Sequence, residues 1–233
     1  MTHGIVDKLA HHRGRSRTVA KTDTDPQTHE PVGAPAILKH ALAAIEEHGY
    51  HGTTVRDIAR RVGVTVPTLY YHFENKQAIL VELLMSSMEL LLARCRVALA
   101  ETGKNPADRY AALITTIVEF MAQGGSHGLL DSEIRSLEPA NRTKYIALRD
   151  ELETQLHRII ADGVTQGTFT TPYPVETGRA VLTMCHSIPR WFNPGGPLTP
   201  QQLAERYVTI ALNAVGHRAP AKPRTRTKQT TAT

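Results

Sequence analysis

Residues 55–76 read VRDIARRVGVTVPTLYYHFENK, and this stretch predicts two short helices joined by a tight turn at Gly63-Val64. The first helix carries apolar residues at the i, i+3, i+4, i+7 spacing that places them on one face: Val55, Ile58, Ala59 and Val62. The second helix offers a complementary apolar surface: Val66, Leu69 and Phe73. The side chains left pointing away from that surface are Thr65, Pro67, Thr68, Tyr71 and His72, with Tyr70 at its edge. A short helix held by its apolar face, with hydroxyls, rings and an imidazole outward, suits the major groove of DNA.

The ends of both helices are specified by the residue types around them. Gly63 follows the first helix, where a left-handed C-cap is wanted, and Thr65 can cap the second, which has a proline in its first turn. A third helix is expected to begin at Glu74 or Asn75, and its first-turn amides together with Lys76 can hold a phosphate. The alternative is an ordinary pair of packed helices inside an all-helical protein, because helix pairs are far commoner than DNA readers.

Several of these positions form one extended motif: Thr54-Val55-Arg56-Asp57-Ile58-Ala59, then Gly63-Val64, then Thr68-Leu69-Tyr70-Tyr71-His72-Phe73 and Asn75-Lys76. Over residues 36–84, and without a gap, the chain resembles the DNA-binding domain of the TetR family of bacterial transcription regulators. A motif of many positions is far more specific than a lone glycine pattern. The resemblance implies an all-α protein with an amino-terminal three-helix DNA-binding domain and a variable carboxyl-terminal domain that binds a ligand and dimerises. It also implies a homodimer that reads a palindromic double-stranded DNA operator.

Carried over position by position, the resemblance implies a set of DNA contacts in which Lys76 takes a phosphate. The full set is Thr54, Arg56, Thr65, Val66, Pro67, Thr68, Tyr70, Tyr71, His72 and Lys76. Val66 departs from the pattern, because a polar side chain there could hydrogen-bond a base edge, whereas valine offers only an apolar contact such as one to a thymine methyl. Sequence readout is therefore expected to depend more on Thr68, Tyr71 and DNA shape.

Four parts are expected in the chain. Composition predicts a disordered basic arm at residues 1–33 and a disordered basic tail at 218–233, and the resemblance implies a helix-turn-helix domain at 34–80 and a ligand-binding and dimerisation domain at 81–217. The five basic residues of the tail equal the whole net charge of +5, so DNA binding must use local placement and helix N-termini instead of a general basic field. The arginines at 13, 15 and 17 either enter a minor groove or belong to a solvated leader.

The remainder reads as helices almost throughout, and no strand pattern of comparable quality occurs. Outward from the motif, helices are expected at 35–48, ended by Gly49, at 75–100, from 105 to 123, around 130–137, and at 142–166, 175–190 and 199–217. The long helix from Asn75 could carry a tilt of its far end to the DNA-binding helices. In the family, the last two helices pair with the same helices of a second subunit, and the core or interface positions there are Val181, Met184, Ile188, Leu203, Tyr207, Ile210 and Ala214.

The effector is less well specified. The stretch PRWFNPGGP at residues 189–197 is similar to the segment before the last helix in TetR-family repressors that sense acyl-CoA thioesters, and Arg190 would then meet a ligand phosphate. A Pro-Gly-rich connection with Trp191 packed beneath it explains the same residues. The residues expected to bind the effector are Tyr110, Phe120, Met121, Tyr145, Met184, Arg190 and Trp191.

The sequence has few other features that suggest a metal site, catalysis or membrane binding. Cys95 and Cys185 lie in helical patterns and are expected to be buried free thiols, and the 12 histidines have no ligand spacing typical of a metal site. No phosphate loop, nucleophile elbow or pair of carboxylates suggests catalysis, so neither a cofactor nor enzymatic activity is expected. The chain lacks an apolar signal sequence and a run long enough to span a bilayer, which favours a cytoplasmic protein with no membrane partner.

These patterns and the resemblance together predict a ligand-responsive regulator. The preferred prediction is a homodimeric repressor released from its operator by a small molecule such as an acyl-CoA. The alternatives are an effector-independent DNA-binding or architectural protein, an activator, and, from another class, an enzyme or ligand-binding protein that uses the domain as a scaffold.

Overall fold

The computed structural model describes residues 33–123 and 133–217, which fold into helices with no strand among them. The all-α prediction is therefore confirmed. In chain order the elements are α2 (Ala34–Gly52), α3 (Val55–Val62), α4 (Val66–His72), α5 (Lys76–Glu101), α6 (Pro106–Ala122), the 3-10 helix η2 (Glu133–Ser136), α8 (Pro139–Thr165), α9 (Pro174–His186), the 3-10 helix η3 (Ile188–Arg190) and α10 (Pro200–Ala214). None of the described helices is long and apolar enough to cross a membrane.

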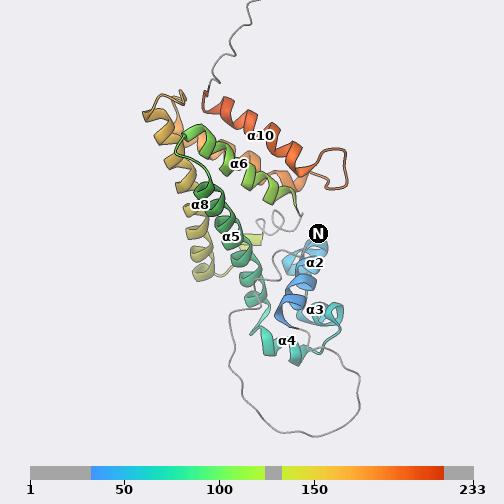
Figure 1. Ribbon diagram of the computed structural model, residues 1–233. Coiled ribbons are helices and arrows are strands. Elements are labelled where there is room, and N and C mark those ends of the chain that lie inside the picture. The colour runs from blue at the N-terminus through green and yellow to red at the C-terminus, as the bar shows by residue number, and fades with distance from the viewer. Residues whose placement is uncertain (1–32, 124–132, 218–233) are drawn as a thin grey trace, which may run out of the picture.

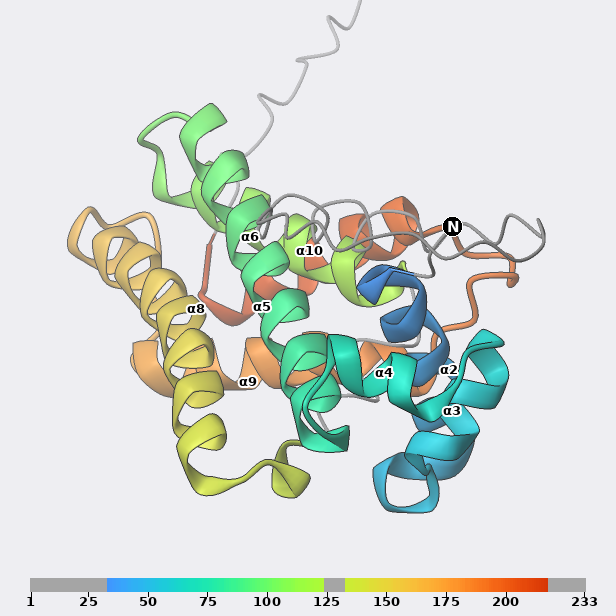
Figure 2. The same cartoon turned by 90° about the horizontal axis from the view of Figure 1, so that it is seen from below.

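Helices α2, α3 and α4 form one end of the molecule, and α5 leads from them into a layered bundle made with α6, α8, α9 and α10 (Figure 1). Seen from the α4 end, α8 lies on one side of α5, and α2 and α3 lie on the other (Figure 2). The 26 residues of α5 span about 39 Å at 1.5 Å per residue. The boundary expected at residue 80 falls inside this continuous helix, so α5 belongs to both parts of the molecule.

Most helix ends lie where the residue types place them. Gly63 adopts the left-handed conformation (φ 79°) that ends α3, and the Thr54 and Thr65 side chains cap α3 and α4. Gly49, expected to end the first helix, does leave helical geometry (φ 71°, ψ 165°). One more turn, through Tyr50, follows this kink before α2 finishes.

The later helices differ from expectation at their ends. Helix α8 begins at Pro139 and not at Arg142, because proline is well suited to a first helical turn. The expected helix at 175–190 is α9 followed by η3, with Pro189 in the 3-10 turn. The short piece expected at 130–137 is described only from Glu133, where it is a 3-10 helix. The arm expected at 1–33, apart from Gly33, and the tail at 218–233 lie outside the described residues.

One apolar core runs through α6, α8, α9 and α10, which together with η2 and η3 are called the effector domain, and continues along α5 to α2, α3 and α4. Among the largest fully buried side chains are Tyr110 of α6 and Phe169, whose rings meet edge to face with centroids 5.5 Å apart. Both cysteines are free and buried, as expected. Three of the positions expected in the core or the subunit interface belong to the core, since Val181, Ile188 and Leu203 are buried within the single chain. Met184 and Tyr207 are half-buried, and Ile210 and Ala214 are exposed.

Candidate nucleic-acid interface and effector cleft

The α3–α4 unit is built as its apolar pattern predicts. Ile58 and Ala59 of α3 and Leu69 of α4 are buried, as is Phe73 directly after α4. Val55, Val62 and Val66 pack more loosely against the same core. Burial of this face fixes which side chains α4 presents to solvent.

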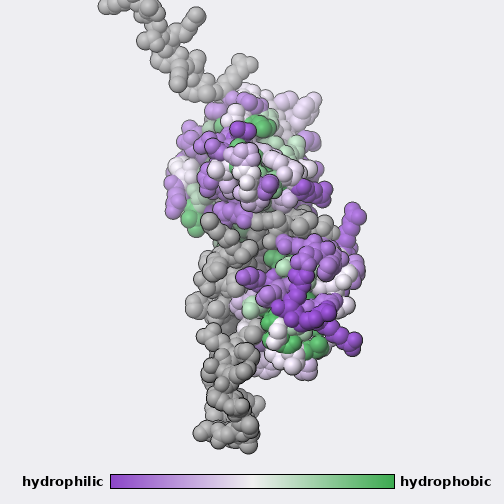
Figure 3. Space-filling model, turned by 90° about the vertical axis from the view of Figure 1, so that its right-hand side faces the viewer, coloured by the Kyte–Doolittle hydropathy of each residue, from purple (hydrophilic) through white to green (hydrophobic). Residues whose placement is uncertain are grey.

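The exposed face of α4 carries the residues expected to read DNA. Tyr71 is 87% exposed and Tyr70 is 49% exposed, and the rings of Tyr71 and His72 meet edge to face at 5.3 Å. Thr65 and Pro67 are exposed, and Thr68 is half-buried. A groove between α3 and α4 joins this face to the start of α3 and is lined by Thr54, Val55, Arg56, Asp57, Arg60, Val66 and Tyr70. Figure 3 shows one side of the molecule, on which hydrophilic side chains predominate over this end, with small hydrophobic patches among them.

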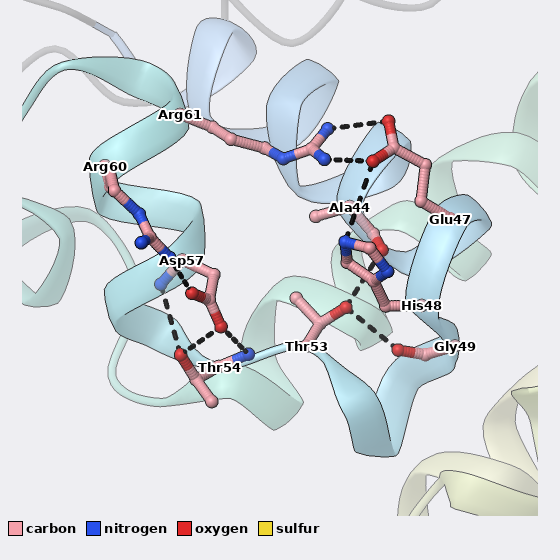
Figure 4. A network of polar contacts seen from close by, with 9 residues as sticks. All are labelled: Ala44, Glu47, His48, Gly49, Thr53, Thr54, Asp57, Arg60 and Arg61. Atoms are coloured by element: carbon pink, nitrogen blue, oxygen red, sulfur yellow. Dashed lines mark hydrogen bonds and ion pairs between the residues drawn. The ribbon is translucent and has the colours of Figure 1, made fainter.

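Polar side-chain contacts join α3 and the residues before it to α2 (Figure 4). The guanidinium of Arg61 bonds both carboxylate oxygens of Glu47, with Nη1 2.9 Å from Oε1. The buried Thr53 hydroxyl donates to the carbonyls of Ala44 (3.0 Å) and Gly49 (2.9 Å). Because Thr53 directly precedes the α3 cap, these bonds fix where α3 starts relative to α2.

Electrostatics at this end leave one arginine available. The hydrogen bond and charge of Arg61 lower the pKa of Glu47, and hydrogen bonds from Thr54 lower the pKa of Asp57, which also pairs with Arg60. Arg56 is exposed, and no carboxylate pairs with it in the described part of the chain. Its guanidinium is thus free to donate to a phosphate or base. Arg60 was not expected in the groove, and only the packing of α3 beside α4 brings it there.

Lys76 contacts the end of α2. Its Nζ donates to the carbonyls of Tyr50 and Thr53, at 2.9 Å in each case, and sits 4.1 Å from the centroid of the Tyr50 ring. The ammonium therefore binds the end of α2, and its contact with a phosphate stays a prediction. Helix α5 begins at Lys76, one residue after the later of the two expected starts, and Asn75 caps it by accepting from Ala78 N at 2.8 Å.

The seven residues expected to bind the effector differ in their exposure. Tyr110, Phe120, Met121 and Tyr145 are buried in the core, Met184 is half-buried, and Arg190 and Trp191 are exposed. Trp191 is 53% exposed. The buried hydroxyl of Tyr110 has no hydrogen-bond partner within the described residues.

A cleft of about 460 Å³ opens between α5, α8 and α9. Met88, Leu152 and Leu182 give it an apolar floor, and charged and polar side chains surround them: Arg149, Asp150, Glu153, Arg179, Thr183 and His186, beside Ile146. The α9 residues and all of the α8 residues except Leu152 follow i, i+3, i+4, i+7 spacing, which is the one signal in the sequence that could have grouped them. None of the seven expected residues lines this cleft.

Both parts of the chain match known protein families. Residues 37–83 match the family model described as bacterial regulatory proteins, tetR family, and residues 103–215 match the model of the tetracyclin repressor-like C-terminal domain. The HTH-type transcriptional repressor KstR2 of Mycobacterium tuberculosis is 30% identical over 182 residues, which cover 77% of this chain and 90% of that protein. The chain belongs to the TetR family. This TetR-family chain is thus a DNA-binding transcriptional regulator with a ligand-binding carboxyl-terminal domain, and not an enzyme.

Solved structures of the family agree in fold. The ketosteroid transcriptional regulator KstR2 of Mycobacterium tuberculosis superposes on this TetR-family chain with a TM-score of 0.72 at 27% identity, covering 78% of this chain and 94% of that one. PfmR of Thermus thermophilus gives a TM-score of 0.70 at 34% identity, covering 76% and 97%. AibR in complex with isovaleryl coenzyme A and operator DNA gives 0.67 at 25% identity, covering 75% and 95%.

Proposed function

We propose that this TetR-family regulator is a cytoplasmic repressor that binds a palindromic operator as a homodimer and is released by an acyl-CoA thioester. The observation that carries the DNA-binding part is the solvent-facing side of α4, where Tyr71 is 87% exposed, together with the exposed Arg56 of α3, which has no ion-pair partner among the described residues. Two copies related by a two-fold axis would place two such helices on successive half-sites.

The DNA contacts follow from this face. Thr65, Pro67, Thr68, Tyr70, Tyr71 and His72 would enter the major groove, and Thr54 and Arg56 would bind the backbone or base edges next to it. Val66 is half-buried and packs against the core, so its contact with bases would be apolar and small. Lys76, engaged with α2, is left out of this set.

The α5–α8–α9 cleft fits an amphiphilic anion. An acyl chain would pack against Met88, Leu152 and Leu182, and phosphates would meet Arg149 and Arg179 at the rim. Nε of Arg179 donates to Glu153 at 3.0 Å, so a phosphate would exchange for that carboxylate. The isovaleryl coenzyme A bound by AibR supports the choice of a CoA thioester.

Release would be a population shift. The ligand would bind more tightly to the conformation whose two recognition helices are misplaced for successive grooves, and it could move the equilibrium only by that difference in affinity. Because α5 carries Met88 of the cleft and also follows α4 directly, it gives the ligand a mechanical link to the DNA-binding end.

The test is an unbiased operator selection with the purified full chain, followed by mobility-shift titration with isovaleryl-CoA, longer acyl-CoAs and steroid-derived CoA thioesters. The matched free acids and free coenzyme A serve as controls. An enriched palindrome whose complex dissociates only with a thioester supports the proposal. A complex that resists every thioester would indicate an effector-independent DNA-binding protein, and no enriched sequence at low salt would refute sequence-specific binding.

A further inference from the structure

The backbone N–H and carbonyl of Tyr50 are each bound by a charged side chain, and the two side chains have opposite charge. Its N–H donates to Oε1 of Glu133 at 3.1 Å, across 83 residues of sequence. Its carbonyl accepts from Nζ of Lys76 at 2.9 Å. Glu133 belongs to η2, in the effector domain, and Lys76 is the first residue of α5. A single turn of α2 is therefore bound both by the effector domain and by the long helix.

The backbone makes this arrangement necessary. Gly49, with φ 71° and ψ 165°, interrupts α2, so the next N–H leaves the helical hydrogen-bond pattern and needs another acceptor. The Glu133 carboxylate supplies it, and its second oxygen accepts from Ser136 Oγ at 3.0 Å. Burial lowers the pKa of Lys76, and the negative charge of Glu133 opposes that effect. The two side chains therefore also attract each other electrostatically.

Further contacts tie the same two regions together. Gln77, in the amide orientation that satisfies its neighbours, donates to Tyr50 Oη at 3.0 Å and to the Ser136 carbonyl at 3.1 Å, and accepts from Glu138 N at 2.9 Å. Ser136 Oγ lies 3.2 Å from Nε2 of His51. The segment that leads into α8 is thus bonded to both the end of α2 and the start of α5.

We propose that Glu133 and Lys76 are positioning residues which, by binding the backbone N–H and carbonyl of Tyr50, set the orientation of the α3–α4 unit relative to the effector domain. The proposal rests on the DNA-binding role of α4. Thr53 connects this turn to α3 within two residues, and Lys76 also binds the Thr53 carbonyl at 2.9 Å. A shift of η2 or of the start of α8 would therefore reach α3 without passing along α5.

The orientation can be measured without operator or effector. Spin labels at Tyr71→Cys and Val97→Cys report the distance from α4 to the far part of α5, and dilution with unlabelled protein isolates the distance within one subunit. Both sites are exposed, at 87% and 57%. The native Cys95 and Cys185 are fully buried, and burial raises the pKa of each thiol to about 12, so they resist labelling.

Three variants distinguish a positioning role of Glu133 from a general effect of removing a carboxylate from this segment. Glu133→Ala removes the acceptor and should broaden the narrow wild-type distance distribution, whereas Glu133→Gln keeps an amide oxygen for Tyr50 N–H and should preserve it. The exposed Glu138→Ala, in the same segment, is the matched control and should match wild type. A Glu133→Ala distribution equal to that of Glu138→Ala would overturn the proposal.

Operator affinity supplies a second readout. Glu133→Ala should weaken binding about tenfold or more, as expected when one partner of a charged hydrogen bond is lost, and Glu133→Gln should recover most of it. Lys76→Met should weaken binding and broaden the distance with no change in salt dependence. If Lys76 instead contacts a phosphate, the slope of log affinity against log salt should fall by about 0.9, and this would overturn its positioning role.

If no operator is found, the proposed function fails while the distance measurement still decides the role of Glu133. If an operator is found but the distances do not change, only the positioning role fails.

Discussion

The indole of Trp191 stacks on the phenol ring of Tyr207, with centroids 6.4 Å apart and an angle of 21° between the rings. This contact joins the segment after η3 to α10, yet Trp191 remains 53% exposed. Ile210, one turn beyond Tyr207 on α10, is 52% exposed. Trp191 and Ile210 thus expose apolar surface near the half-buried Tyr207, and in the proposed homodimer a second copy of the chain would cover it.

Replacing Ile210 with arginine should dissociate the homodimer. Burying an isoleucine contributes about 1.5–3 kcal/mol, and a two-fold interface contains it twice, so the dimer dissociation constant should rise about a hundredfold or more. Sedimentation velocity over a concentration series measures this change. Val97→Arg replaces an equally exposed residue on α5 and should leave the dimer intact. If Ile210→Arg sediments as wild type does, α10 is not the interface.

Val66→Gln should alter operator preference. Glutamine can pair with an adenine edge, and a good bidentate contact discriminates by about 1–3 kcal/mol, whereas valine offers no hydrogen bond. Parallel binding-site selections with wild type and variant should differ at one symmetric pair of positions. Val62→Ala, in the loosely packed part of the same core, controls for general loosening of the domain. Identical selected sequences for wild type and Val66→Gln would show that position 66 does not read bases.

The Glu47–Arg61 pair should add stability that depends on pH. Since its folded pKa is lowered below the ordinary value of 4.5, Glu47 stabilises the fold above that pH, and the contribution disappears as the pH falls through the lower folded value. Wild type should therefore melt slightly above Glu47→Gln at about pH 6 and equally at about pH 3. Thermal unfolding followed by circular dichroism checks this. The exposed neighbour Glu46→Gln should show a smaller difference, and a pH-independent gap for Glu47→Gln would contradict the assignment.

Ile146→Trp should block the effector response without loss of operator binding. Ile146 lines the α5–α8–α9 cleft and is 42% exposed, so a larger ring there would occupy the cleft while the core stays intact. In a mobility-shift titration, the thioester that releases wild type should fail to release this variant. Ala147→Trp, exposed on the same helix and outside the cleft lining, should respond normally. Equal release of the two variants would place the effector elsewhere.

Gly163→Ala should destabilise the effector domain by about 1–3 kcal/mol, because overpacking of a tight core has costs of this size. A methyl group at Gly163 of α8 would overlap the ring of Phe169, whose own N–H is held by the Gly163 carbonyl at 3.0 Å. Urea denaturation measures the loss. Thr165→Ala, exposed on the same helix, should change stability by no more than about 0.5 kcal/mol. Equal stabilities would mean that Phe169 moves aside freely.

Local chemistry made much of the DNA-binding end predictable. Gly63 takes the left-handed φ that ends α3, and Thr54 and Thr65 cap the two helices, because these preferences act within a few residues of the chain. The apolar spacing also identified Ile58, Ala59 and Leu69 as buried, which leaves Tyr71 outside. These features follow from neighbours in sequence and from helical periodicity alone.

The sequence by itself thus determined the all-α class, the two capped helices of the DNA-binding unit and the outward face of α4. Only the tertiary structure decided that Lys76 binds the end of α2, that Val181 and Leu203 belong to the core while Ile210 faces outward, and that α8 and α9 join to line a cleft. The physical reason is that these outcomes depend on which helix faces meet, and the partners come from segments far apart in the chain. Periodicity shows that a helix has an apolar face, whereas packing decides what covers it.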